Sequence, residues 1–116
     1  MADSKDMVKA AFKGLSDKKA EDIQVIDIQG VSVIADYFVI ASGTNSNQIE
    51  AMCDAVEEEL YKIGKTPKQI EGNKSSTWIL MDFEDVIVHI FSSEDRLFYE
   101  LDKIWRDGTI VDIDSI

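Results

Sequence analysis

The chain has 116 residues, of which 45% are hydrophobic and 30% charged, with one proline and six glycines. This composition fits one globular domain with a single core and excludes a collagen-like or disordered chain. The formal net charge of −11 argues against direct binding to exposed phosphate backbone, which needs clustered Lys and Arg.

Three features of the sequence indicate the compartment in which the protein works. No apolar stretch approaches the roughly 20 residues that a membrane span requires. The N-terminal sequence MADSKDMVKAAF carries neither a signal-peptide core nor an arginine-rich transit pattern. The single cysteine, Cys53, cannot form an internal disulfide, which fits a reducing compartment. We therefore expect a cytoplasmic protein that binds neither membrane nor DNA.

The first part of the chain predicts a helix followed by two strands. Ser4 can cap a helix whose apolar stripe is formed by Val8, Ala11, Phe12 and Leu15. Residues 23–28 alternate and are β-rich, Gly30 marks a turn, and residues 37–41 form an apolar run typical of a buried strand.

The segment SGTNSNQ, residues 42–48, reads as strand end, polar turn and helix start. Asn45 and Gln48 resemble a capping box with Asn in place of the usual Ser or Thr. The helix that follows ends before Gly64. Its predicted core face consists of Ile49, Met52, Cys53, Val56, Leu60 and Ile63.

The remaining strands are predicted at residues 69–71, as a short edge strand, and at 77–83 and 85–91, as a hairpin around Glu84. In the first hairpin strand, alternation places Trp78, Leu80 and Asp82 on one face and Thr77, Ile79, Met81 and Phe83 on the other. Ser92 or Ser93 then caps a last helix with the core stripe Leu97, Leu101 and Ile104. The tail, residues 107–116, is either disordered or a small edge strand.

These elements predict an α/β fold: a single domain over residues 1–106, with a mixed, mostly five-stranded sheet flanked by helices.

Few residues could support catalysis. His89 is the only histidine and lies in mid-strand, where a structural, hydrogen-bonded imidazole is favoured over a catalyst. Cys53, its conceivable nucleophile partner, lies on a core helix face and is expected to be a small buried hydrophobe. Backbone N–H groups of the Ser42–Gly43–Thr44 turn could hold an anion, although a well-capped helix explains the same residues. Asp82 and Asp85 straddle a turn, so they lack the alternating spacing of a nucleotidyltransferase metal pair.

An interaction surface is the stronger functional signal. Residues 82–116 hold ten acids against three bases, a net −7 of the chain's −11. Trp78 follows a polar loop and shares a face with Asp82, and Tyr99 lies beside charged residues. Each is either core or a half-exposed anchor of the kind that concentrates binding energy at protein interfaces. Trp105 fits the core better.

Five segments, in this order, resemble the ribosomal silencing factor family, also called Iojap or YbeB. They are ADYFVIASGTNSNQ (35–48), the pair Glu71–Gly72, W-x-x-x-D (78–82), DVIVHIF (85–91) and R-x-x-Y-x-L-x-x-x-W (96–105). The resemblance covers residues 4–106, and the chain is similar to the bacterial members rather than the organellar ones.

The resemblance implies a nucleotidyltransferase-like topology without the catalytic carboxylates, and neither enzymatic activity nor a cofactor. It implies binding to the large ribosomal subunit through large-subunit protein fourteen on the intersubunit face. Small-subunit joining is then blocked sterically, and translation falls when nutrients are scarce. Homodimers are also implied. The interface residues implied by the resemblance are Trp78, Leu80, Asp82, Phe83 and Tyr99.

Two alternatives stay open at this point. One is a nucleotidyltransferase-like nucleotide-binding enzyme, which would depend on Asp82 and Asp85. The other is a plain dimerisation module.

Overall fold

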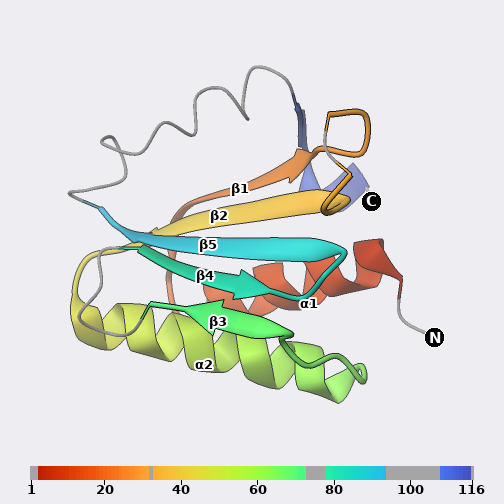
Figure 1. The fold of residues 1–116 in the computed structure, drawn as a ribbon. Helices are drawn as coiled ribbons and strands as arrows, with labels where there is room; N and C mark the ends of the chain where they lie inside the picture. The colour runs from red at the N-terminus through yellow and green to blue at the C-terminus, as the bar shows by residue number, and fades with distance from the viewer. Residues whose placement is uncertain (1–2, 32, 73–77, 94–107, 116) are drawn as a thin grey trace.

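The computed structural model describes residues 3–31, 33–72, 78–93 and 108–115. The order of the helices and strands along the chain is seen in Figure 1. The elements are α1 (Ser4–Asp17), β1 (Glu21–Asp27), β2 (Tyr37–Gly43), α2 (Ser46–Lys62), β3 (Gln69–Glu71), β4 (Trp78–Asp82), β5 (Val86–Ser92), β6 (Thr109–Val111) and the 3₁₀ helix η2 (Ile113–Ser115).

The strands form one mixed sheet in the order β3-β4-β5-β2-β1-β6. Among the described strands, β2 and β5 form the one parallel pair, and the other neighbouring pairs are antiparallel. The predicted α/β class and mixed sheet are confirmed, but the predicted number of five strands was wrong, because the described residues form six. The sixth is β6, which lies in the predicted tail and pairs with β1 at the opposite end of the sequence.

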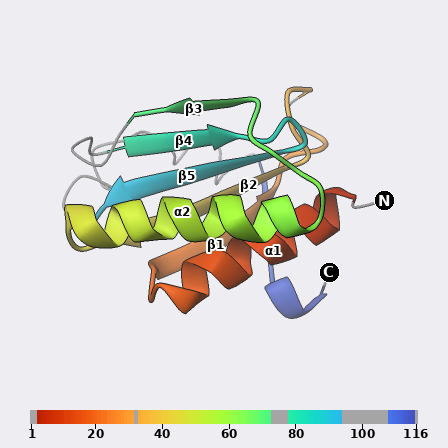
Figure 2. The same ribbon diagram turned by 90° about the horizontal axis from the view of Figure 1, so that it is seen from below.

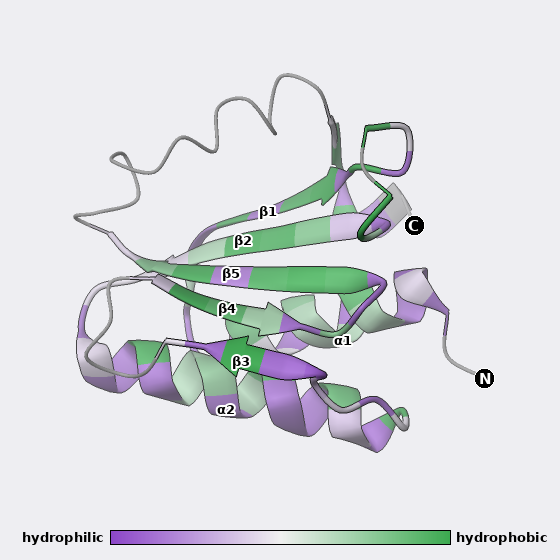
Figure 3. Cartoon of the chain, viewed as in Figure 1, coloured by the Kyte–Doolittle hydropathy of each residue, from purple (hydrophilic) through white to green (hydrophobic). Residues whose placement is uncertain are grey.

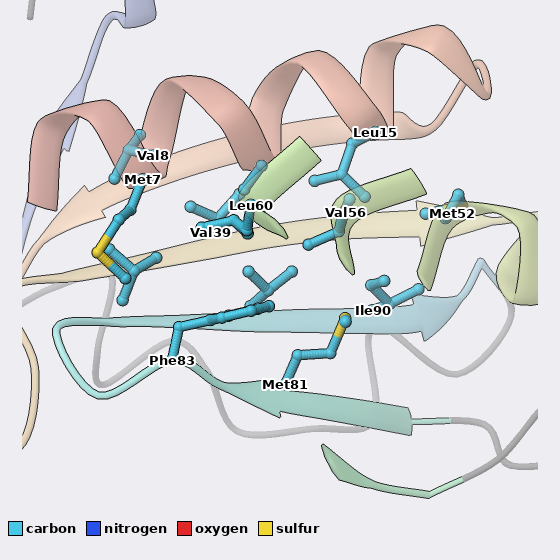
Figure 4. Close-up of a cluster of buried hydrophobic side chains, with 14 of the residues drawn as sticks. Met7, Val8, Leu15, Val39, Met52, Val56, Leu60, Met81, Phe83 and Ile90 are labelled. Carbon is cyan, nitrogen blue, oxygen red and sulfur yellow. The ribbon is translucent and has the colours of Figure 1, made fainter. Parts of the chain in front are cut away.

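Helices α1 and α2 cover the same face of the sheet, as Figure 2 shows. Their amphipathic stripes meet the inner side chains of the strands in a large apolar cluster, part of which is drawn in Figure 4. Its fully buried members include Val8, Leu15, Val39, Met52 and Leu60. The last predicted helix lies outside the described residues.

The opposite face of the sheet carries a second buried cluster. It consists of Ile26, Ile28, Ala35, Phe38, Ile40, Ile87 and Phe91, with Leu80 packed against it. Strands β2 and β5 contribute to both clusters, which explains why they are apolar over most of their length in Figure 3.

The ends of the helices follow from local hydrogen bonds. Helix α1 is capped by Asp3 rather than by the predicted Ser4, because Asp3 and Asp6 form a reciprocal capping box. Helix α2 begins after the predicted cap Asn45, whose side chain accepts from the Gln48 backbone N–H at 2.8 Å. Gly64, with φ +82°, follows the C-cap residue Ile63, the position predicted for it.

Within the described part of the chain, neither helix combines the length and the apolar character that crossing a bilayer requires.

Candidate protein-binding surface

Strand β4 presents its side chains to two different surroundings. Ile79 and Met81 are buried in the large cluster under the helices. Trp78, Leu80 and Asp82 alternate with them and face the other side of the sheet, where Leu80 packs against the second cluster. The predicted division of this strand into two faces is therefore confirmed for residues 78–83, whereas Thr77 lies outside the described residues.

Trp78 is the exposed end of an aromatic group on that second face. Its side chain is 39% exposed, and its indole Nε1–H donates to Nδ1 of His89 at 3.1 Å. The ring also stacks on its cross-strand partner Phe91, with centroids 5.6 Å apart and an interplanar angle of 17°. Stacking and hydrogen bond together fix the orientation of the indole.

His89 is the buried anchor of the group. Its ring is 4% exposed and meets Phe38 edge-on at a centroid distance of 4.8 Å. Burial lowers the pKa of His89 to about 4, so the imidazole is neutral at physiological pH. Because Nδ1 accepts from Trp78, the proton of this tautomer lies on Nε2. Nε2 is buried, and no described residue pairs with it. The predicted structural imidazole is thus confirmed.

Asp82 lies at the end of β4, partly buried. Its Oδ1 accepts from the backbone N–H of Glu84 at 2.8 Å. This bond supports the tight turn to β5, in which Glu84 takes a φ of +72°. One carboxylate oxygen of Asp82 is thereby used in the turn.

The two remaining predicted interface residues are placed differently. Phe83 is 4% exposed and packs in the cluster beneath the helices, so its side chain forms no part of the exposed surface. Tyr99 lies outside the described residues, as does Trp105.

The catalytic pairing of Cys53 with His89 is not formed. Cys53 packs from α2 against the cluster under the helices, whereas His89 contacts aromatic rings on the other face of the sheet. Cys53 is half-buried rather than fully buried as was predicted for it. Burial, then the carboxylates of Asp54, Glu57 and Glu50, raise its pKa to about 12, so the thiol is a poor nucleophile.

The turn before α2 is a structural element. The backbone N–H of Thr44 is bonded to Gln48 Oε1 at 2.7 Å, and that of Gln48 to the Asn45 cap. Gly43 is required by close packing, since a Cβ there would lie 2.8 Å from Cγ1 of Ile49. The N–H groups of Thr44 and Gln48 are therefore already bonded within the turn.

Among the described residues, no group of three or more His, Cys, Asp or Glu side chains is arranged to hold a metal ion. Asp82 serves the turn, and Asp85 beyond it is exposed.

Sequence reasoning missed several exposed apolar side chains. Val31, Val33 and Ile34 are exposed in the loop between β1 and β2, and Ile110 is exposed on β6. The apolar run after Gly30 is the signal that could have indicated these exposed side chains; the sequence predicts only a turn at Gly30.

Comparisons with known proteins agree on one family. The family model described as ribosomal silencing factor during starvation matches residues 1–116. The Ribosomal silencing factor RsfS of Bacillus subtilis is 36% identical over 110 residues, which cover 95% of this chain and 93% of that protein. The protein of the same name from Zymomonas mobilis is 37% identical over 102 residues, covering 88% and 77% of the two chains.

A solved structure has the same fold. The crystal structure of a Chromobacterium violaceum protein aligns with a TM-score of 0.86 at 26% identity, covering 93% of this chain and 90% of the other.

Proposed function

Because the chain belongs to the ribosomal silencing factor family, we propose that it binds the large ribosomal subunit and prevents the small subunit from joining. Members are non-enzymatic regulators, so the nucleotidyltransferase-like enzyme considered from sequence is set aside. The protein represses translation, and it does so by occupying a surface rather than by chemistry.

Within the large subunit, the proposed binding partner is large-subunit protein fourteen, on the intersubunit face. A bound globular domain at that place occupies volume that the small subunit needs, and translation then falls when nutrients are scarce. The bacterial relatives favour action in the cytoplasm. The family resemblance also motivates a homodimer whose contact surface overlaps the ribosome-binding one.

The proposed contact surface is centred on Trp78 and includes Leu80 and Asp82 on the same face of β4. The family resemblance adds Tyr99 to the proposed contact residues. The observation that carries this choice is the fixed indole: Trp78 is 39% exposed, yet its ring is stacked and hydrogen-bonded. An aromatic anchor that is already oriented loses little side-chain entropy on binding. Phe83 contributes to this surface only indirectly: its side chain packs in the core and supports the end of β4.

Charge favours a basic partner. The chain's −11 includes Asp82, Glu84 and Asp85, which lie at the other end of β4 from Trp78 and in the turn that follows it. Carboxylates at the rim of an interface attract Lys and Arg and speed association, and salt screens this attraction. We therefore expect binding that weakens as ionic strength rises.

The test is sedimentation of the purified protein with isolated large subunits, with small subunits and with reassociating mixtures. Binding to large subunits alone, with fewer joined ribosomes, supports the proposal. Trp78→Ala is expected to weaken binding about thirtyfold, the effect of losing roughly 2 kcal/mol at an interface hot spot. Tyr61→Ala is the matched control, because Tyr61 is an aromatic residue 70% exposed on α2. No sedimentation with large subunits at low salt would contradict the proposal.

The proposed homodimer is tested separately by sedimentation equilibrium of the free protein. A dimer that dissociates in Trp78→Ala supports overlapping surfaces, whereas a dimer unaffected by this change places the self-association surface elsewhere.

A further inference from the structure

A groove lies between α2 and the edge strand β3, on the face of the sheet opposite to Trp78. Its volume is about 300 Å³, enough for one or two apolar side chains. It is lined by Glu50, Cys53, Asp54, Glu57, Ile70, Gly72, Ile79 and Met81.

The floor of the groove is apolar. Ile79 and Met81 are buried side chains of β4, and Ile70 of β3 pairs with Met81 across the sheet. Ile70 is 43% exposed, and it forms the apolar centre of β3 in Figure 3. Cys53 closes the floor from α2 as a neutral thiol. A guest side chain here would bury the exposed apolar surface of Ile70.

One wall of the groove is acidic. Glu50, Asp54 and Glu57 are spaced i, i+4 and i+7 on α2, so they form a single stripe along the helix. The ion pairs of α2 within the described residues use Glu59 instead, which contacts Lys13 and Lys62. The stripe therefore presents three carboxylates that the described lysines leave uncompensated.

The other wall is a strand edge. β3 ends the sheet, pairs with β4 on one side and has all three residues exposed. At its end Gly72 takes a φ of +91° and runs against the carbonyl of Trp78, where a Cβ would lie only 2.6 Å away. A sheet edge of this kind offers backbone groups to an added strand.

We propose that this groove binds a short, extended, basic segment of a partner protein. The segment pairs with β3, places an apolar side chain over Ile70 and Met81, and directs Lys or Arg side chains to Glu50, Asp54 and Glu57. This surface is separate from the proposed ribosome contact, so the protein can hold a second partner while Trp78 is occupied.

Charge selects this occupant over others. Nucleic acid is repelled by the acidic stripe. A second copy of the chain would bring its own identical stripe to the same edge, and like charges across an interface oppose association. A segment in which basic and apolar residues alternate can contact the apolar floor, pair with the acidic side chains of α2 and form backbone hydrogen bonds with the edge of β3.

The probe is a short blocked peptide of alternating lysine and valine, titrated into the ¹⁵N-labelled protein and followed by NMR. Shift changes are expected at Gln69–Gly72 and along Glu50–Glu57. A peptide of alternating glutamate and valine is expected to leave these signals unchanged. An N-methylated version of the basic peptide keeps its charge but loses backbone donors, so it is expected to bind more weakly.

Two triple variants separate the groove from general attraction to an acidic protein. Glu50→Gln with Asp54→Asn and Glu57→Gln is expected to raise the Kd of the basic peptide about tenfold or more. Glu58→Gln with Glu84→Gln and Asp114→Asn removes the same charge from exposed sites outside the groove and is expected to change the Kd less than about threefold.

The proposal is overturned if the basic peptide shifts no groove residue, or if both triple variants weaken binding equally. Equal affinity of the N-methylated peptide would overturn strand pairing. If the protein self-associates through β3 and the peptide does not displace the second copy, the groove binds a second copy of the chain and the proposal is wrong.

Discussion

The indole Nε1–H of Trp78 donates to Nδ1 of His89 at 3.1 Å, a diagonal contact between β4 and β5. The two residues are not directly opposite, because Trp78 faces Phe91 and His89 faces Leu80. Long side chains reach such diagonal neighbours, and here the contact ties a half-exposed ring to one that is 4% exposed. The orientation of the surface thus depends on a residue that a partner does not touch.

Trp78→Phe should separate the hydrogen bond from the stacking. Phenylalanine keeps an aromatic face toward Phe91 but leaves the buried Nδ1 of His89 without its donor. We expect a loss of about 1–3 kcal/mol in the free energy of unfolding, measured by urea denaturation. Tyr61→Phe on α2 is the control and should stay within about 0.5 kcal/mol. Equal losses in the two variants would show that the hydrogen bond contributes nothing.

His89 should make stability depend on pH. Its pKa in the folded protein is about 4, against 6.5 for the free side chain. As pH falls through 6.5 the unfolded chain binds a proton that the folded chain refuses, so stability is complete above that pH and declines toward pH 4. The decline attributable to His89 is up to about 3 kcal/mol, at roughly 1.4 kcal/mol per pH unit.

The measurement is urea denaturation at several pH values between 4 and 7, with His89→Asn as the reference. Carboxylates titrate in both proteins, so the difference in slope isolates the imidazole. Parallel curves would mean that His89 protonates freely in the folded state.

Gly14→Ala should destabilise the protein although alanine favours helices. A Cβ at Gly14 would lie 2.8 Å from the backbone of Ala55, so α1 and α2 would have to separate. Overpacking of this kind costs about 1–3 kcal/mol, more than the roughly 1 kcal/mol gained in helix propensity. Gly30→Ala is the control, since no atom lies within 4 Å of a Cβ there. A thermal melt in which Gly14→Ala raises Tm would refute close helix contact.

Gln48→Ala should loosen the start of α2. The Gln48 amide accepts from the backbone N–H of Thr44 at 2.7 Å and donates to the carbonyls of Lys18 and Lys19 at 3.1 and 3.0 Å. These bonds join the α2 N-terminus to the end of α1, and we expect a loss of about 1–2 kcal/mol by chemical denaturation. Asn47→Ala changes an exposed neighbour and should have little effect. Similar losses of stability in both variants would show that the effect comes from the first turn of α2 rather than from the hydrogen bonds of Gln48 to Lys18 and Lys19.

Local patterns predicted the parts of the fold that depend on neighbours in sequence. Helix α2 was predicted with its cap at Asn45 and its end before Gly64, because capping and apolar periodicity act within a few residues. The faces of β4 were predicted because alternation in a strand is fixed by backbone geometry.

Features that depend on distant partners were harder to predict. The three-residue strand β6 has too weak a pattern to be assigned without β1 beside it. The Trp78–His89 bond depends on the register of β4 against β5, although the sequence did indicate a bonded imidazole. For the contact surface, alternation selected Trp78, Leu80 and Asp82 as one face, but burial removed Phe83 from the exposed set.

The pairing of β1 with β6 also sets a limit on synthesis. β1 is made early, yet its outer edge stays open until Thr109–Val111 has left the translating ribosome and reached it. An open edge can template pairing with other nascent chains. In a chain released before residue 109, the outer edge of β1 would stay unpaired. Premature termination near the end should therefore yield an aggregating product rather than a slightly shortened domain.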